Sequence, residues 1–294
     1  MKKIFDRIIL GTNPFEGVSY ISRTQALHYL ENFSRKENII PILEASYNMG
    51  TRTITCTNNE ILLSALEDFC NKHDDISLIP LIPNAYEYAR EASEKGVLGT
   101  VFNRIKRIDL YQKLRLGLRT LNRVKGIISK DVLALLAELI DFELSCFKKY
   151  NICGVVLHGQ ITDLALSSNN KNIIKIYLDI IKETYRVQPI LATHNFGSLL
   201  PKLMEWEINI PIMAPFNRKG FMMRPSKKTC EALIDNTDYY IIAKKVLAGG
   251  RLFPEEAFPY IADKKIGSVA VGVGTVSEAY HTLGVAKSIL DSTS

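Results

Sequence analysis

Two adjacent lysines pose the first chemical question in this sequence. Lys244 and Lys245 follow the apolar run YYIIA (239–243) and precede the stretch VLAGG (246–250). Removing a lysine ammonium from water costs free energy unless the charge is paired, neutralised or used in a reaction. A lysine in a water-poor pocket has a lowered pKa, which suits imine formation or proton transfer. The alternative is a lysine that stays charged and pairs with Glu16 or with an anionic substrate.

Several other polar side chains also stand at the ends of short apolar runs. Histidine and glutamate transfer protons, while amide and hydroxyl groups hold the polar parts of a substrate. The candidates for catalysis beside Lys244 are His158, His194 and Glu16, and the candidates for substrate binding are Asn13, Thr57, Asn195 and Asn217. Each also has a structural explanation, such as a hydrogen bond to a loop carbonyl or turn formation by an asparagine next to a proline.

The elements that must position these residues alternate regularly along the chain. Eight apolar runs have the length and composition of strands: 7–14, 51–57, 76–83, 152–159, 188–195, 209–217, 239–245 and 267–275. The stretches between them, such as 58–73, 169–185, 254–264 and 276–290, repeat apolar residues at three- and four-residue steps, as amphipathic helices do. Eight strand–helix units predict an α/β fold of the (β/α)8 TIM-barrel type, forming a single domain over residues 1–294. A doubly wound open sheet is the competing arrangement.

Two connections depart from a minimal barrel. The segment between the first two strands is long enough for two helices. Residues 84–151 form a helical insertion between strands three and four, and residues 104–125 within it hold eight Lys or Arg against one Asp. Their interspersed leucines are too many for a freely solvated loop. We expect this basic segment to act as a lid over an anionic substrate or as a homo-oligomer contact, with a solvated cationic helix as the plainer alternative.

A barrel of this kind carries its chemistry at the carboxyl ends of its strands, so the candidate residues should meet on one rim. Side chains alternate across a strand. If Tyr240 and Ile242 point inward, Lys244 lies in the barrel mouth and Lys245 points toward the surrounding helices; the opposite alternation exchanges the two lysines.

Glycines follow the last two strands, where barrels commonly bind anions through backbone amides and a helix N-terminus. The stretches AGG (248–250) and GVGT (272–275) occupy these positions. The sequence therefore predicts an anion site formed by Gly249, Gly250, Gly274 and Thr275.

Composition narrows the class of protein. The chain has 294 residues, 47% of them hydrophobic, and five scattered cysteines with no CxxC pair, so neither a disulfide framework nor a zinc site is indicated. The net charge of +6 is concentrated in residues 104–125, so the overall charge says little about nucleic acid, and we expect no specific nucleic-acid partner. No apolar run approaches the ~18 residues of a membrane span. The opening MKKIFDRIIL reaches polar GTNP before a signal-peptide core forms, so we expect a cytoplasmic location.

The pattern resembles that of the aldo-keto reductases, a family of NAD(P)-linked oxidoreductase barrels. The likeness is carried by IILGTNPFEG (8–17), ILEASYNMGTRTITCTNNE (42–60), VVLHG (155–159), AKKVLAGG (243–250) and VAVGVGT (269–275). These stretches are similar to the family's first turn, its first helix and second strand, its strand-four histidine and its two cofactor-binding segments. The resemblance implies a small carbonyl substrate and an NADP or NAD cofactor held near Gly249, Gly250, Gly274 and Thr275.

The chain departs from that family in its catalytic residues. The family uses an Asp and a Tyr after strand two, a Lys ending strand three and a His ending strand four. Only His158 has a counterpart, because TITCTNNE (53–60) contains neither Asp nor Tyr and IPLIPNAY (79–86) contains no Lys. Hydride transfer without the tyrosine lacks its general acid. A charged Lys244 would also stand where such reductases flank the nicotinamide, and it would disfavour the positively charged oxidised ring.

Three functions are therefore open. The first is an aldo-keto reductase-like, NAD(P)(H)-dependent oxidoreductase that acts on a small anionic carbonyl compound with altered acid–base residues such as His158 and His194. The second is a cofactor-independent lyase or aldolase in which Lys244 forms an imine with its substrate. The third is a non-catalytic, ligand-binding barrel.

Overall fold

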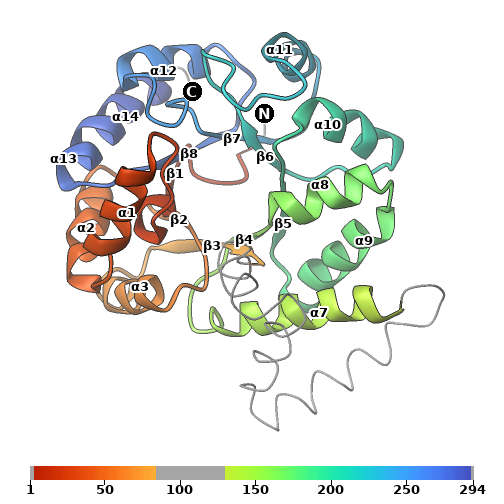
Figure 1. Ribbon diagram of the computed structural model, residues 1–294, viewed down its shortest axis with the longest axis horizontal. Coiled ribbons are helices and arrows are strands. Elements are labelled where there is room, and N and C mark those ends of the chain that lie inside the picture. The colour runs from red at the N-terminus through yellow and green to blue at the C-terminus, as the bar shows by residue number, and fades with distance from the viewer. Residues whose placement is uncertain (1–2, 84–129, 293–294) are drawn as a thin grey trace, which may run out of the picture.

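A computed structural model of the chain describes residues 3–83 and 130–292, and these residues form a closed barrel (Figure 1). Its strands are β1 (Ile8–Gly11), β2 (Thr53–Cys56), β3 (Ser77–Ile82), β4 (Gly154–Leu157), β5 (Gln188–Ala192), β6 (Ile212–Pro215), β7 (Ile241–Lys244) and β8 (Ser268–Gly272). Each strand pairs in parallel with the next, and β8 pairs with β1. The predicted (β/α)8 barrel is confirmed, and every predicted strand run contains an observed strand.

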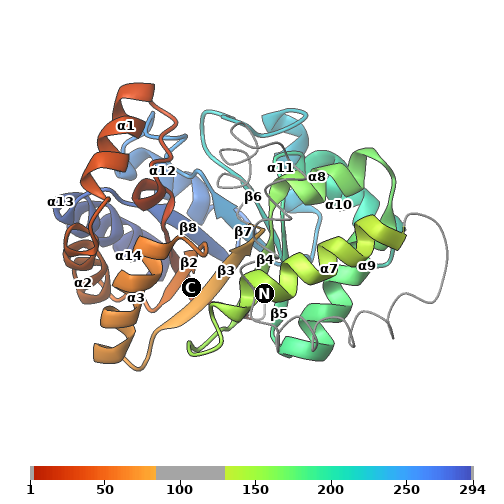
Figure 2. The same ribbon diagram turned by 60° about the horizontal axis from the view of Figure 1, so that its bottom comes forward.

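Helices surround the barrel wall (Figures 1 and 2). The α-helices are α1 (Arg23–Asn32), α2 (Ile40–Asn48), α3 (Glu60–Lys72), α7 (Lys130–Ser145), α8 (Gly159–Ser167), α9 (Lys171–Asp179), α10 (Phe196–Glu205), α11 (Lys227–Asp235), α12 (Pro254–Ala262), α13 (Val276–Glu278) and α14 (Gly284–Asp291). Shorter 3-10 or π-helical turns are η1 (Asn13–Glu16), η2 (Lys36–Asn38), η3 (Ile180–Tyr185) and η4 (Ala279–Leu283). As predicted, two helices separate β1 from β2. The basic segment 104–125, predicted to be a lid or an oligomer contact, falls outside the described residues.

Local sequence signals explain where several helices begin. The side chain of Asn59 accepts a hydrogen bond from the Leu62 N–H at 3.0 Å at the start of α3. Ser226 accepts one from the Thr229 N–H at 3.1 Å at the start of α11. Each cap satisfies a backbone donor that has no partner inside the helix and typically contributes about 1 kcal/mol.

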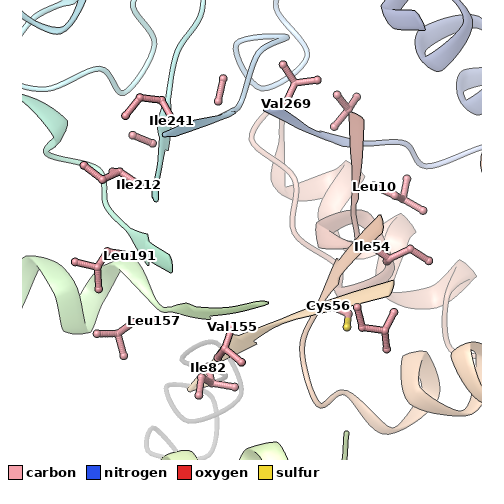
Figure 3. Packing of buried hydrophobic residues seen from close by; sticks show 14 of the residues in the cluster. Leu10, Ile54, Cys56, Ile82, Val155, Leu157, Leu191, Ile212, Ile241 and Val269 are labelled. Atoms are coloured by element: carbon pink, nitrogen blue, oxygen red, sulfur yellow. The ribbon is translucent and has the colours of Figure 1, made fainter. Parts of the chain in front are cut away.

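Alternate residues of each strand pack on opposite sides of the barrel wall. Figure 3 shows outward-pointing residues between the strands and the helices: Leu10, Ile54, Cys56, Ile82, Val155, Leu157, Leu191, Ile212, Ile241 and Val269. A separate cluster fills the barrel itself, and it includes Ile9, Ile79, Val156, Ile190 and Ile242. Fully burying an aliphatic side chain of this size contributes about 1.5–3 kcal/mol. The apolar interior leaves the ends of the strands as the place for polar groups.

Within the described residues, no helix combines the length and apolar character that crossing a bilayer would require.

Candidate active site

Lys244 is the last residue of β7 and lies on the inner side of the barrel wall. Ile241 and Ala243 belong to the outer hydrophobic layer, whereas Tyr240 and Ile242 belong to the cluster inside the barrel. Strand alternation therefore directs the Lys244 side chain into the mouth. The inward direction expected for Lys244 agrees with this packing.

Burial changes the protonation of Lys244. Desolvation lowers its pKa from the ordinary value of 10.5 to about 8, and the Asp163 carboxylate opposes this change. In the part of the chain that the structure describes, Lys244 forms no ion pair, so the expected alternative of a pair with Glu16 is not seen. A substantial neutral fraction near neutral pH makes this amine both a proton donor and a nucleophile.

Lys245 leaves the strand through a left-handed backbone conformation with φ of 56°. Its Nζ lies 3.4 Å from the centroid of the Tyr20 ring in the loop between β1 and α1. The side chain therefore does not point simply toward the surrounding helices, as alternation predicted, because the positive φ interrupts the strand pattern. Burial first, and the neighbouring Lys244 second, lower the pKa of Lys245 to about 7.

A second cation joins Lys245 at this side of the mouth. The Tyr20 and Phe221 rings meet edge to face with centroids 6.5 Å apart, and the Arg251 guanidinium lies 4.3 Å from the Phe221 centroid. Arg251 also donates a hydrogen bond from Nη2 to the Tyr20 carbonyl at 2.8 Å. Lys245 and Arg251 thus gather on two aromatic rings, where cation–π attraction partly replaces the lost hydration.

His158 follows β4 and caps helix α8. Its Nδ1 accepts a hydrogen bond from the Gln160 N–H at 3.2 Å, so the neutral ring carries its proton on Nε2. Burial, followed by the charge of Lys244, lowers the pKa of His158 from 6.5 to about 4. His158 therefore has a structural role, because one ring nitrogen caps the helix. It is also available for chemistry, because the ring stays neutral beside Lys244.

His194 and Asp163 lie next to each other on the same side of the mouth. The His194 Nδ1 is 3.9 Å from an Asp163 carboxylate oxygen, but burial and then Lys244 lower the pKa of His194 to about 3. The contact is therefore not an ion pair at neutral pH. Asp163 also accepts a hydrogen bond from the Thr193 hydroxyl at 2.5 Å and one from the His194 N–H at 3.2 Å.

Asp163 is the functional candidate that sequence reasoning missed. It lies inside α8 and not at the end of an apolar run, so a prediction based on strand ends does not include it. The available signal was its position one turn into the helix that starts at His158. A carboxylate at this position lies near the carboxyl ends of the strands, where Asp163 contacts Thr193 and His194.

Glu16 lies on the β1–β2 side of the rim, where two threonines hold its carboxylate. Thr57 donates to Oε2 at 2.7 Å and Thr12 donates to Oε1 at 3.3 Å. The Glu16 charge adds to burial in raising the pKa of the Cys56 thiol. The structure therefore brings the predicted residues Glu16 and Thr57 together, while the catalytic role of Glu16 stays a prediction.

The predicted asparagines have different surroundings. Asn13 donates from Nδ2 to the Tyr20 hydroxyl at 3.4 Å. The fully buried Asn217 exchanges two hydrogen bonds with the Phe221 backbone, at 3.0 and 2.8 Å, which closes the loop after β6. Asn195 instead has a buried side-chain oxygen that accepts no hydrogen bond within residues 3–83 and 130–292. Of the three, Asn195 has the clearest unused capacity for a ligand.

The predicted anion-binding glycines already contact side chains of the protein. The Gly274 N–H donates to the Glu278 carboxylate at 2.7 Å, and the Thr275 hydroxyl accepts from the Glu278 N–H at 3.0 Å. Side chains of Tyr20 and Ile21 lie against Gly249 and Gly250, which both have positive φ, while Tyr29 lies against Gly274. A phosphate at Gly274 would meet the Glu278 carboxylate, so like charge opposes the predicted anion site there.

No three His, Cys, Asp or Glu side chains come together as a potential metal site in the described parts of the chain. The available chemistry on the β4, β5 and β7 side is therefore that of a low-pKa lysine, two neutral histidines and one carboxylate. Such a set can donate or accept a proton at a carbonyl compound, or form a covalent bond to it.

The barrel is similar to that of solved aldo-keto reductase structures. Two structures of provisionally assigned aldo-keto reductases from Pseudomonas aeruginosa, one of them the PA4992 protein, match at 13% identity. The TM-scores are 0.60 and 0.61, with 97% of this chain and 90% or 91% of theirs covered. Aldo-keto reductase AKR11C1 from Bacillus halodurans, in its holo form, matches at 12% identity with a TM-score of 0.54, covering 98% of this chain and 92% of that one.

No protein-family model matches the sequence, and no curated protein matches it significantly. At identities this low, the structural likeness establishes the barrel fold. The chemistry has to be argued from the side chains in the mouth.

Proposed function

We propose that this protein is an aldo-keto reductase-like, NAD(P)(H)-dependent oxidoreductase that acts on a small anionic carbonyl compound. In it, Lys244 replaces the tyrosine that serves the family as the proton donor. The observation that carries the proposal is the low-pKa Lys244 inside the mouth of a barrel that is similar to aldo-keto reductases over 97% of the chain. A general acid is most effective when its pKa lies near the working pH, and a pKa of about 8 meets that condition.

The mouth residues have separate roles in this proposal. The Lys244 ammonium donates its proton to the substrate carbonyl oxygen as that oxygen gains negative charge. Neutral His158, with its proton on Nε2, supplies a second polarising group on the same rim. His194 and Asn195 hold polar parts of the substrate, and Asp163 fixes the loop that carries both of them. Desolvation strengthens each of these interactions relative to water.

A nicotinamide cofactor would supply a hydride when bound. The residues that fit its diphosphate are Lys245 and Arg251, not Gly274 and Thr275. Lys245 has a lowered pKa and no ion pair within the described residues, and Arg251 lies in the same aromatic cluster. An anion placed beside these two cations offsets the desolvation of Lys245 and raises its pKa.

Titration with NADPH and with NADH, followed by protein and cofactor fluorescence, tests the proposal. We expect saturable binding to the wild type, and at least about tenfold weaker binding to Lys245→Met/Arg251→Met, since two charge-assisted contacts are lost. The matched control is Lys175→Met/Lys265→Met, which removes two exposed lysines elsewhere. If neither cofactor binds or raises the melting temperature at saturating concentration, the oxidoreductase proposal is wrong, because ligands of the folded state increase stability by mass action.

A second candidate function follows from the same lysine. Neutral Lys244 can attack a carbonyl carbon to form an imine with release of water, as in a cofactor-independent lyase or aldolase. Borohydride added with small keto acids or aldehydes would reduce such an imine to a stable secondary amine. A mass increase located at Lys244, and absent from Lys244→Met, would support this function. Modification spread equally over exposed lysines would count against it.

A further inference from the structure

A separate cavity lies at the end of the barrel opposite Lys244. Its volume is about 580 Å³, within the usual range of small-molecule sites of roughly 300–1,000 Å³. Segments that lead into β4, β5 and β6 line it together with the end of the preceding helix: Ile152, Cys153, Lys182, Arg186, Val187, Gln188, Pro189, Asn209 and Ile210. We call it the basal pocket. Because the strands are parallel, the amino ends that form it cannot belong to the mouth.

The basal pocket is cationic. Among the described residues that line it, Lys182 and Arg186 carry charge, and both are exposed to solvent. Neither forms an ion pair with any residue that the structure describes. Gln188 and Asn209 add two side-chain amides to the same wall. Guanidinium, ammonium and amide groups together match the oxygen atoms of a phosphate.

The backbone that presents Arg186 is unusual. Residues Ile180–Tyr185 form a π-helical turn, and Arg186 ends it with φ of 55° and ψ of 36°. Turns of the π type are rare and occur often at functional sites. A left-handed conformation is unfavourable for a residue with a side chain. The chain therefore keeps a locally unfavourable geometry that places Arg186 at the edge of the cavity.

Within the described residues, no carboxylate forms an ion pair with Lys182 or Arg186. Asp6, at the same end of the barrel, accepts a hydrogen bond from the Thr53 hydroxyl at 2.6 Å and pairs with Lys3 at 3.6 Å. Glu183 and Glu207 do not line the cavity.

The remaining lining residues are Ile152, Cys153, Val187, Pro189 and Ile210. A ligand that fits the cavity has an anionic group for the two cations and an uncharged body that fills the remaining volume. We propose that the basal pocket binds a small phosphorylated metabolite of about the size of a nucleoside monophosphate, with its phosphate between Lys182 and Arg186. This site is independent of the chemistry in the mouth.

Calorimetric titration with adenosine monophosphate tests the proposal, with inorganic phosphate and uncharged adenosine as separate probes. We expect the monophosphate to bind more tightly than inorganic phosphate, and adenosine to bind weakly or not at all. The variant Lys182→Gln/Arg186→Gln should weaken monophosphate binding by about tenfold or more, through loss of two charge-assisted hydrogen bonds. Binding of inorganic phosphate alone would keep the anion site but contradict the nucleotide-sized ligand.

Two further variants separate this site from general charge effects and from the mouth. Lys175→Gln/Lys265→Gln makes the same change in net charge at exposed positions, and it should bind like the wild type. Lys245→Met/Arg251→Met, which removes the two cations proposed to hold an anion in the mouth, should also leave the binding unchanged. The proposal is overturned if the basal-pocket and exposed-lysine double variants lose affinity equally, if Lys245→Met/Arg251→Met abolishes binding, or if none of the probes binds to the folded wild-type protein.

Discussion

The polar groups on the two sides of the barrel mouth differ in their hydrogen-bond partners and in their protonation. On the β8, β1 and β2 side, the Glu278 carboxylate is bonded to the Gly274 amide, and Glu16 is bonded to Thr57 and Thr12. On the β4, β5 and β7 side, desolvated lysines and neutral histidines lie near the Asp163 carboxylate. We call these the paired side and the cationic side.

This difference identifies the side on which a bound ligand would gain the most favourable interactions. A ligand that approaches the paired side must compete with hydrogen bonds that the protein already makes. An anionic ligand on the cationic side instead restores charges that burial has disfavoured. Perturbed pKa values are a common property of reaction centres, and the lowered pKa values of His158, His194, Lys244 and Lys245 lie together on the cationic side.

The largest expected effect comes from removing the central lysine. Lys244→Met should lower kcat for any carbonyl substrate by about 10²- to 10⁴-fold, the usual contribution of a general acid. Folding should be retained, because methionine fills a similar volume without an ammonium to desolvate. Steady-state kinetics and circular dichroism measure both quantities. If the variant keeps the wild-type kcat, Lys244 is not the general acid.

A smaller effect is expected from Asp163→Asn. Its negative charge raises the pKa of Lys244, so the variant should have a Lys244 pKa below about 8. An activity that needs the ammonium form would then decline at a lower pH in the variant than in the wild type. The variant also loses an acceptor for the His194 N–H, at a cost of about 1–3 kcal/mol. A pH profile identical to that of the wild type would contradict the coupling between Asp163 and Lys244.

The dependence of stability on pH should separate the cationic side from ordinary surface charge. Lys244 and Lys245 have folded-state pKa values of about 8 and about 7, against 10.5 in an unfolded chain. Between these values the unfolded state binds more protons, so the free energy of unfolding should rise as pH increases from about 7 to about 10. Denaturant unfolding of Lys244→Met/Lys245→Met should show a flatter curve over this range. Parallel curves for the two proteins would mean that the lysines titrate normally.

The smallest effect is expected on the paired side. Glu278→Ala removes the acceptor for the Gly274 amide and should cost about 1 kcal/mol of stability, with little change in cofactor affinity. Thermal unfolding and NADPH titration check the two parts. If affinity instead rises about tenfold, the amides of the β8–α13 loop are the anion site, and the predicted role of Gly274 and Thr275 holds.

Sequence reasoning predicted the fold well because strand and helix periodicities are local properties. The eight apolar runs each contain one strand, and the rule that strands end at one rim brought His158, His194 and Lys244 together. It predicted side-chain environments less well. The hydrogen bond from the Gly274 N–H to the Glu278 carboxylate depends on loop conformation, and the position of Lys245 depends on one positive φ. Asp163 was missed because it acts from a helix.

The central claim is that Lys244 is a desolvated lysine in the barrel mouth, and its pKa can be measured directly. An NMR titration of protein carrying lysine labelled with ¹³C at Cε, with the Lys244 signal assigned by its absence in Lys244→Met, follows this one side chain. The structure predicts a midpoint near pH 8 for Lys244. A midpoint above about 10, the range of a solvated lysine, would contradict the claim and the functions built on it.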